Sequence, residues 1–212
     1  MSVAENLKAV RDRIEKAGRN PDEIAIVAVS KGFGPDVCRE AVSAGLRVLG
    51  ENRVQEALAK MDAVDGARWH LIGHLQTNKV KQVAGKFALI QSIDSTRVAE
   101  AVAAIDSAQP VLVEVNVAQE TQKTGVDPKA AGELIDRVAE MLDLQGLMAM
   151  GPAEGDPTPA FEQLRKLRDE AQQRLGRPLP ILSIGMSGDF EAAVKAGSTM
   201  LRLGRVLFGP RG

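Results

Sequence analysis

The sequence predicts an α/β protein, a single (β/α)8 TIM barrel with an extra helix at its N-terminus. Eight short apolar runs alternate with segments of helical periodicity along the 212 residues, which is typical of parallel strands joined by right-handed helical crossovers. Eight such units indicate a closed barrel, although the length is near the low end of the roughly 200 to 400 residues that barrels span. An open doubly wound sheet is the alternative, but no G-x-G-x-x-G motif follows the first predicted strand.

The predicted strands are apolar runs bounded by glycine, proline or polar residues. The first, residues 24–30, does not alternate apolar with polar side chains, which is typical of a strand buried on both faces. The fifth, residues 110–117, is the clearest because it is rich in valine. The other predicted strands are residues 47–50, 68–72, 88–92, 144–148, 180–184 and 199–203.

Helical periodicity and capping residues place helices between these runs. Ser2 and Glu5 form a capping-box pattern before a helix over residues 3–17, and we expect this helix to cover the gap between the last and first units. The longest helix, residues 160–175, carries an apolar stripe and ends at Gly176. The remaining predicted helices cover residues 35–44, 54–61 and 78–84, and three more follow Asp94, Pro128 and Gly188.

Composition and charge exclude several classes of function. The formal net charge of -1 gives no electrostatic support for a nucleic-acid partner. Cys38 is the one cysteine, so an internal disulfide is impossible and a reducing compartment fits. No window approaches the roughly 20 apolar residues of a membrane span, and the N-terminus lacks a secretory pattern. We therefore expect a cytoplasmic protein with no membrane association. His70 and His74 have no surrounding cysteine or carboxylate cluster, so no metal site is predicted.

Lys31 ends the first predicted strand and is the main candidate for a functional group. An ammonium at the end of a buried strand is costly to bury unless something pairs with it or reacts with it. In a barrel, binding and catalytic groups lie at the C-terminal ends of the strands. The sequence therefore favours a functional amine in a pocket, and the alternative is a lysine that simply reaches solvent.

The turns after strands seven and eight have the features of a phosphate site. Ser187 and Gly188 precede a helix, whose unpaired N–H groups and positive dipole end attract anions. Gly204 follows strand eight and lets a second loop approach closely. Each residue alone is better explained as an ordinary cap or turn. Together they favour phosphate, because barrels commonly bind it at these two loops.

Arg202 lies in strand eight, in a run that should be buried, so it needs a partner. That partner is either a carboxylate such as Glu51 or Glu114, or a ring nitrogen or anionic group of a ligand. Lys31, the phosphate loops and Arg202 together suggest pyridoxal 5′-phosphate (PLP), held as a Schiff base on the lysine. A barrel aldolase or isomerase, with Lys31 attacking a substrate carbonyl, explains the lysine and the loops but not Arg202.

At these residues the chain resembles the pyridoxal phosphate homeostasis proteins, small barrels of the alanine-racemase-like, fold type III group. The matching motifs run from one end to the other: AVSK (28–31), GENxVQE (50–56), WHxIGxLQxNK (69–79), KxG (123–125), GLMA (146–149), LSxGMSxDxEAA (182–193), GST (197–199) and RxGxxxFG (202–209). Three positions depart from the family pattern. Arg53 and His74 stand where tyrosine and proline are frequent, and Arg205 replaces a small hydroxyl residue. The last change alters the phosphate contacts that the family pattern implies, because it adds a cation beside them.

The resemblance implies one PLP-binding domain over residues 1–212, with the cofactor attached to Lys31. The other cofactor contacts that it implies are phosphate contacts from Ser187, Gly188, Gly204 and Arg205, a contact of Arg202 with the pyridine nitrogen, and Asn52, His70 and Met148 nearby.

The resemblance also bears on whether this chain is an enzyme. A PLP-dependent racemase or decarboxylase of the same group is the alternative. Such a racemase needs a second acid/base, which is a tyrosine supplied by an additional domain and a partner subunit. This sequence contains no tyrosine. We therefore expect a monomeric, non-catalytic protein of intracellular PLP homeostasis, with apo PLP-dependent enzymes as candidate recipients.

Overall fold

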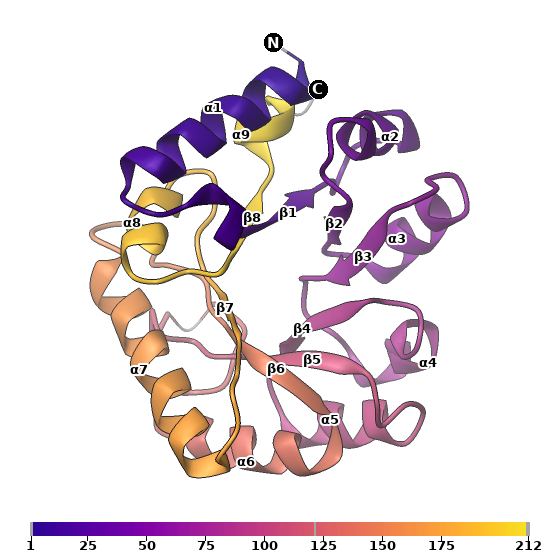
Figure 1. Ribbon diagram of the computed structural model, residues 1–212. Coiled ribbons are helices and arrows are strands. Elements are labelled where there is room, and N and C mark those ends of the chain that lie inside the picture. The colour runs from indigo at the N-terminus through magenta and orange to yellow at the C-terminus, as the bar shows by residue number, and fades with distance from the viewer. Residues whose placement is uncertain (1, 121, 211–212) are drawn as a thin grey trace.

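In the computed structural model, which describes residues 2–120 and 122–210, eight parallel strands close into a barrel (Figure 1). Strands adjacent in sequence pair with each other, and β1 pairs with β8 to complete the ring. This closure confirms the predicted (β/α)8 barrel and excludes the open doubly wound sheet. The strands are β1 Ala25–Val29, β2 Val48–Glu51, β3 Arg68–Leu71, β4 Leu89–Ile93, β5 Pro110–Glu114, β6 Asp143–Met148, β7 Ile181–Ser183 and β8 Met200–Leu203.

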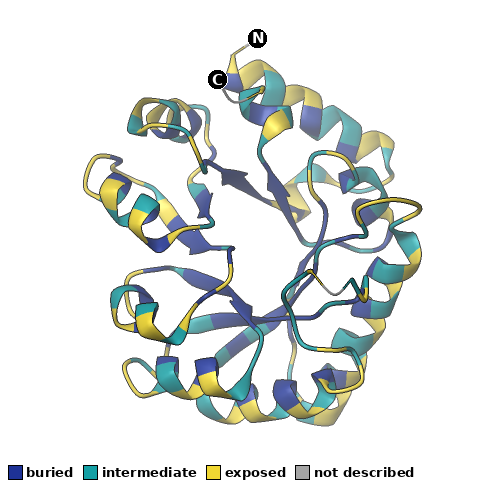
Figure 2. Cartoon of the chain, turned by 180° about the vertical axis from the view of Figure 1, so that it is seen from behind, coloured by how far each residue is buried: buried dark blue, intermediate teal, exposed yellow. Residues whose placement is uncertain are grey.

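Helices surround the strands and turn their polar faces outward. Figure 2 shows the buried residues on the strands and on the inner faces of the helices. The helices are α1 Val3–Lys16, α2 Pro35–Ser43, α3 Val54–Met61, α4 Val80–Val83, α5 Thr96–Ala103, α6 Ala131–Met141, α7 Thr158–Leu175, α8 Phe190–Lys195 and α9 Arg205–Phe208, with short 3-10 turns at Pro21–Glu23 and Thr77–Lys79. None of the helices in the described ranges is both long and apolar enough to cross a membrane.

The N-terminal helix α1 packs beside α9, and the two ends of the chain lie together (Figure 1). The predicted capping box forms, with the Ser2 hydroxyl accepting from the Glu5 N–H. Asn6 Nδ2 donates to the carbonyl of Leu207 in α9 at 2.8 Å. The first helix thus covers the junction between the last and first units, as the sequence predicts.

Two apolar clusters lie on opposite faces of the barrel wall. The larger one fills the space between the strands and the helices. The smaller one fills the barrel interior and consists of Val27, Leu89, Leu112, Met148 and Met200. Because side chains alternate between the two faces of a strand, both faces of these strands are buried.

The structure differs from the sequence prediction at the end of strand five. The strand was expected to reach residue 117, but β5 ends at Glu114. Beyond it, Val115 bridges to Val126, and the Asn116 N–H donates to the Val126 carbonyl at 2.9 Å. The loop thus brings Val126 back beside Val115, and this local pairing takes the place of a longer strand. The chain after strand eight also forms α9, where only a short tail was expected.

Candidate functional site

A cavity of about 720 Å³ opens at the C-terminal ends of the strands. Eight of the nine residues that the sequence predicts for the site line this cavity, and His70 does not. Val29 and Ile72 add apolar wall. The eight residues are Lys31, Asn52, Met148, Ser187, Gly188, Arg202, Gly204 and Arg205.

The alternation of the strands explains how Lys31 reaches the cavity. Val27 lies in the inner cluster, and Val29 lines the cavity two residues later. Lys31 also lines the cavity, and it lies two residues beyond Val29, the last residue of the strand. On β8, Met200 lies in the inner cluster and Arg202 lines the cavity at the same spacing. The period of two therefore directs both cations to the inner face of the barrel.

The loops after β7 and β8 meet at the hydroxyl of Ser187. Its Oγ accepts hydrogen bonds from the backbone N–H groups of Gly204 and Val206, each at 3.3 Å. An anionic oxygen placed here could accept from the same donors. Arg205 adds an exposed cation at the rim of this loop pair. The two predicted phosphate loops are thus adjacent and joined.

The Arg202 guanidinium is buried, and oxygens of two neighbouring strands hold it. Its Nη1 donates to the carbonyl and the hydroxyl oxygen of Ser183, both at 2.7 Å, and its Nη2 donates to the Ala149 carbonyl at 2.8 Å. Among the described residues no carboxylate lies within ion-pair distance of it, which excludes the alternative of an internal salt bridge with Glu51 or Glu114. Burial lowers the pKa of Arg202 to about 10, and the charge of Glu114 opposes this shift. The group stays cationic at neutral pH.

His70 lies beneath the cavity, at the end of a buried chain of hydrogen bonds that begins at Arg202. The Ser183 hydroxyl donates to Gln91 Oε1 at 2.7 Å, and Gln91 Nε2 lies 3.0 Å from His70 Nδ1. Because the amide nitrogen of Gln91 only donates, His70 Nδ1 accepts and carries no proton. Burial lowers the pKa of His70 to about 4, and the charge of Arg68 adds to this. His70 is therefore neutral and braces the residues that hold Arg202.

The depressed pKa of His70 predicts a specific loss of stability in acid. The folded-state pKa is about 4 and the ordinary value is 6.5, so between these values the unfolded chain binds the proton more readily. The free energy of unfolding should therefore fall as pH drops through this window, by about 3 kcal/mol in total. Denaturant titrations at pH 7 and pH 4.5 measure it. His70→Asn keeps an acceptor for Gln91 without a titrating ring and should show a smaller loss. An equal loss in both proteins would contradict this assignment.

Asn52 presents a buried acceptor at the cavity. In the described ranges, its Oδ1 is buried and has no hydrogen-bond partner. Such an atom commonly marks a place where a ligand or water supplies the donor. The cavity suits a phosphorylated aromatic aldehyde. It combines an amine, backbone N–H groups, a guanidinium, the acceptor of Asn52 and apolar walls from Val29 and Ile72.

Several residues of the site escaped the sequence analysis. Gln91 and Ser183 are fully buried and hold Arg202 and His70 together. Both are polar residues inside runs that were predicted as buried strands, and this pattern could have identified them. Lys123 also lines the cavity, where it binds Glu120 and the Gly151 carbonyl at 2.8 and 2.7 Å.

His74 belongs to a different place in the fold. Its Nδ1 lies 3.0 Å from Asp94 Oδ2 in a second pocket of about 490 Å³. It therefore does not share a site with His70. Within the residues that the structure describes, no group of three or more His, Cys, Asp or Glu side chains could hold a metal ion.

Comparisons with known proteins relate this cavity to a family. The model of the family "Alanine racemase, N-terminal domain" matches residues 2–212. The pyridoxal phosphate homeostasis protein of Aquifex aeolicus (strain VF5) is 42% identical over 226 residues, which cover 100% of this chain and 99% of that protein. The structure of PipY from Synechococcus elongatus PCC7942 with PLP bound is 32% identical, with a TM-score of 0.85 over 98% of this chain and 100% of PipY. Alanine racemase from Corynebacterium glutamicum shares the fold at 16% identity, with a TM-score of 0.79 over 98% of this chain and 60% of the racemase.

Proposed function

Because the chain belongs to the alanine racemase N-terminal domain family, we propose that it is a pyridoxal phosphate homeostasis protein that binds PLP covalently through Lys31. The observation that carries this proposal is the cavity itself. It gathers Lys31, the Ser187–Gly204 loop pair and Arg202 at one end of the barrel. PipY, which this chain matches over its full length, has PLP bound in its structure.

Each part of the cavity would hold a different part of the cofactor. The Lys31 amine would hold the cofactor by adding to its aldehyde carbon, which forms a C=N bond and releases one water. The loops joined at Ser187 would bind the phosphate through backbone N–H groups, with Arg205 as an additional cation. Arg202 would contact the ring nitrogen, and Asn52 and Met148 would line the space for the ring.

The electrostatics of the site favour holding the cofactor over catalysis with it. PLP supplies an electron sink when its ring nitrogen is protonated. Arg202 neither protonates the ring nitrogen nor takes a proton from it at neutral pH. Its guanidinium stays charged and donates its hydrogen bonds to three protein oxygens. The sequence also contains no tyrosine to act as a second base. We therefore propose that the protein does not turn over amino acids, in contrast to a racemase-like or decarboxylase-like enzyme.

The remaining parts of the proposal concern the setting in which the protein acts. Residues 1–212 act as one PLP-binding domain, as a monomer in the cytoplasm, without nucleic-acid or membrane partners. Apo PLP-dependent enzymes are the candidate recipients of the cofactor.

The absorption spectrum of the purified protein, before and after addition of PLP, tests the proposal. We expect a yellow protein whose chromophore becomes covalently fixed by borohydride, and peptide mapping should find the label on Lys31. A protein that takes up no PLP would overturn the proposal and favour an aldolase-type use of Lys31 on another carbonyl. Racemisation of alanine at an ordinary enzymatic rate would overturn the non-catalytic part.

A further inference from the structure

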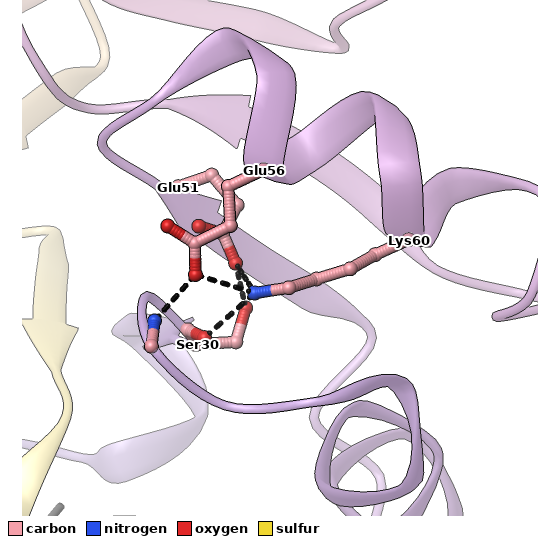
Figure 3. Close-up of polar contacts among 5 residues, drawn as sticks. Ser30, Glu51, Glu56 and Lys60 are labelled. Carbon is pink, nitrogen blue, oxygen red and sulfur yellow. Dashed lines mark hydrogen bonds and ion pairs between the residues drawn. The ribbon is translucent and has the colours of Figure 1, made fainter.

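A buried cluster of charges lies between α3 and the ends of β1 and β2, directly behind the turn that carries Lys31. Glu51 ends β2, and Glu56 and Lys60 come from α3. Figure 3 shows Glu51, Glu56 and Ser30, the residue before Lys31, gathered around the Lys60 ammonium. Glu51 and Ser30 are fully buried, and Lys60 is 5% exposed. The sequence analysis did not predict this cluster.

The cluster holds the backbone on both sides of Lys31. Lys60 Nζ donates to the Ser30 carbonyl at 3.0 Å, which belongs to the peptide group before Lys31. The Gly32 N–H, from the peptide group after Lys31, donates to Glu56 Oε1. The same two side chains form an ion pair of 2.9 Å. Both peptide groups of the attachment residue are therefore tied to one pair of charges on α3.

The Lys60 ammonium is fully occupied in this arrangement. Its three N–H groups match three acceptors, because it also donates to Glu51 Oε1 at 2.7 Å. Glu51 Oε1 in turn accepts from the Ser30 hydroxyl at 2.7 Å. Burying such charges seldom stabilises a fold more than well-packed apolar side chains would. Stability alone therefore gives no reason for an ion cluster at this turn.

The turn itself needs an external constraint. Gly32 adopts a φ of 78°, and Gly34 follows two residues later. Glycine leaves the backbone many accessible conformations, so a lysine next to it would otherwise sample many positions. Fixing a reacting group in place before reaction is a large source of effective concentration.

We propose that Glu56 and Lys60, with Glu51 behind them, are positioning residues that fix the Lys31 turn and so favour covalent capture of the cofactor aldehyde. This inference rests on the proposed function, because it concerns the reactivity of the same lysine. It predicts that the cluster contributes to the covalent part of cofactor binding and not to the phosphate part.

Comparing two ligands separates these parts. PLP can react with Lys31, whereas pyridoxine 5′-phosphate has an alcohol in place of the aldehyde and cannot. In Glu56→Ala, which removes the acceptor of the Gly32 N–H, we expect the affinity for PLP to fall about tenfold. The affinity for pyridoxine 5′-phosphate, measured by the same calorimetric titration, should change by less than about twofold. In the protein without ligand, hydrogen exchange at the Gly32 amide should become faster.

Matched variants complete the experiment. Glu56→Gln keeps an oxygen for the Gly32 N–H and should recover most of the PLP affinity. Asp12→Ala breaks the exposed pair of Lys8 and Asp12, which has the same spacing, and should leave both affinities unchanged. Lys60→Met alone leaves a buried carboxylate and risks misfolding. The double replacement Glu51→Gln with Lys60→Met avoids this and should behave like Glu56→Ala.

The outcomes are distinguishable. If Glu56→Ala weakens both ligands equally, or neither, the cluster is only structural and the inference is wrong. If wild-type protein binds PLP and pyridoxine 5′-phosphate with equal affinity, no covalent capture occurs and the proposed function fails first.

Discussion

Replacing Lys31 with alanine is expected to abolish covalent attachment of PLP and to lower the affinity for it by roughly 100-fold or more. Lys31 lies in the turn after β1 and lines the cavity, and its amine supplies the reacting atom. The variant keeps the loops joined at Ser187 and the buried Arg202. We therefore expect residual, non-covalent binding, with no aldimine absorption band and no label on the protein after borohydride treatment.

Lys31→Arg separates the charge from the nucleophile. A guanidinium retains the positive charge but cannot form the C=N bond, because it does not lose its proton. The arginine variant should therefore lose the chromophore as completely as the alanine variant. Lys86→Ala, at an exposed lysine outside the cavity, should bind PLP like the wild type. Should Lys31→Ala keep a chromophore that borohydride fixes, Lys123, which also lines the cavity, would become the attachment residue.

The strand pattern predicted most of the fold, because burial on both faces leaves a clear signal in sequence. The run at 24–30 has no alternation, and β1 is buried from Ile26 to Val29. Where the pattern failed, local backbone pairing was the cause. The valines after Glu114 look like strand, but Val115 forms an isolated parallel bridge to Val126, which the intervening loop brings back beside it. Nothing in the spacing of residues 115–117 distinguishes these two arrangements.

The site was predictable where position along a strand decides it. Lys31 and Arg202 could be placed because strand ends in a barrel converge. The partners of Arg202 could not, because backbone carbonyls in β7 and just after β6 leave no mark in a sequence. The cluster around Lys60 was hidden for a similar reason. A Glu and a Lys four residues apart on a helix usually form an exposed pair, and only the packing of α3 against β2 and β3 makes Lys60 a buried residue.

Gly146→Ala is expected to cause the largest loss of stability among single methyl additions in the barrel. A Cβ at Gly146 would lie 1.8 Å from the carbonyl oxygen of Ile181 and 2.7 Å from its carbonyl carbon. Gly146 and Ile181 are register partners in β6 and β7, so neither backbone can move without breaking the ladder. Its φ of 156° also disfavours a side chain. We expect a cost of about 3 kcal/mol or more, seen as a fall of about 10 °C in melting temperature.

Gly132→Ala is the matched control, because the same methyl group is added where space exists. Gly132 lies in α6, and the nearest atom to its Cβ would be a side-chain nitrogen of Arg174 at 4.0 Å. Alanine favours a helix, so this variant should be neutral or up to about 1 kcal/mol more stable.

The site should respond to Gly146→Ala as well. β6 carries Met148 into the cavity and leads to the Ala149 carbonyl that holds Arg202. Gly146→Ala should therefore weaken binding of pyridoxine 5′-phosphate as well as that of PLP. Equal melting temperatures for the two variants would mean that the β6–β7 ladder can open without loss, and that its register does not set the position of Arg202.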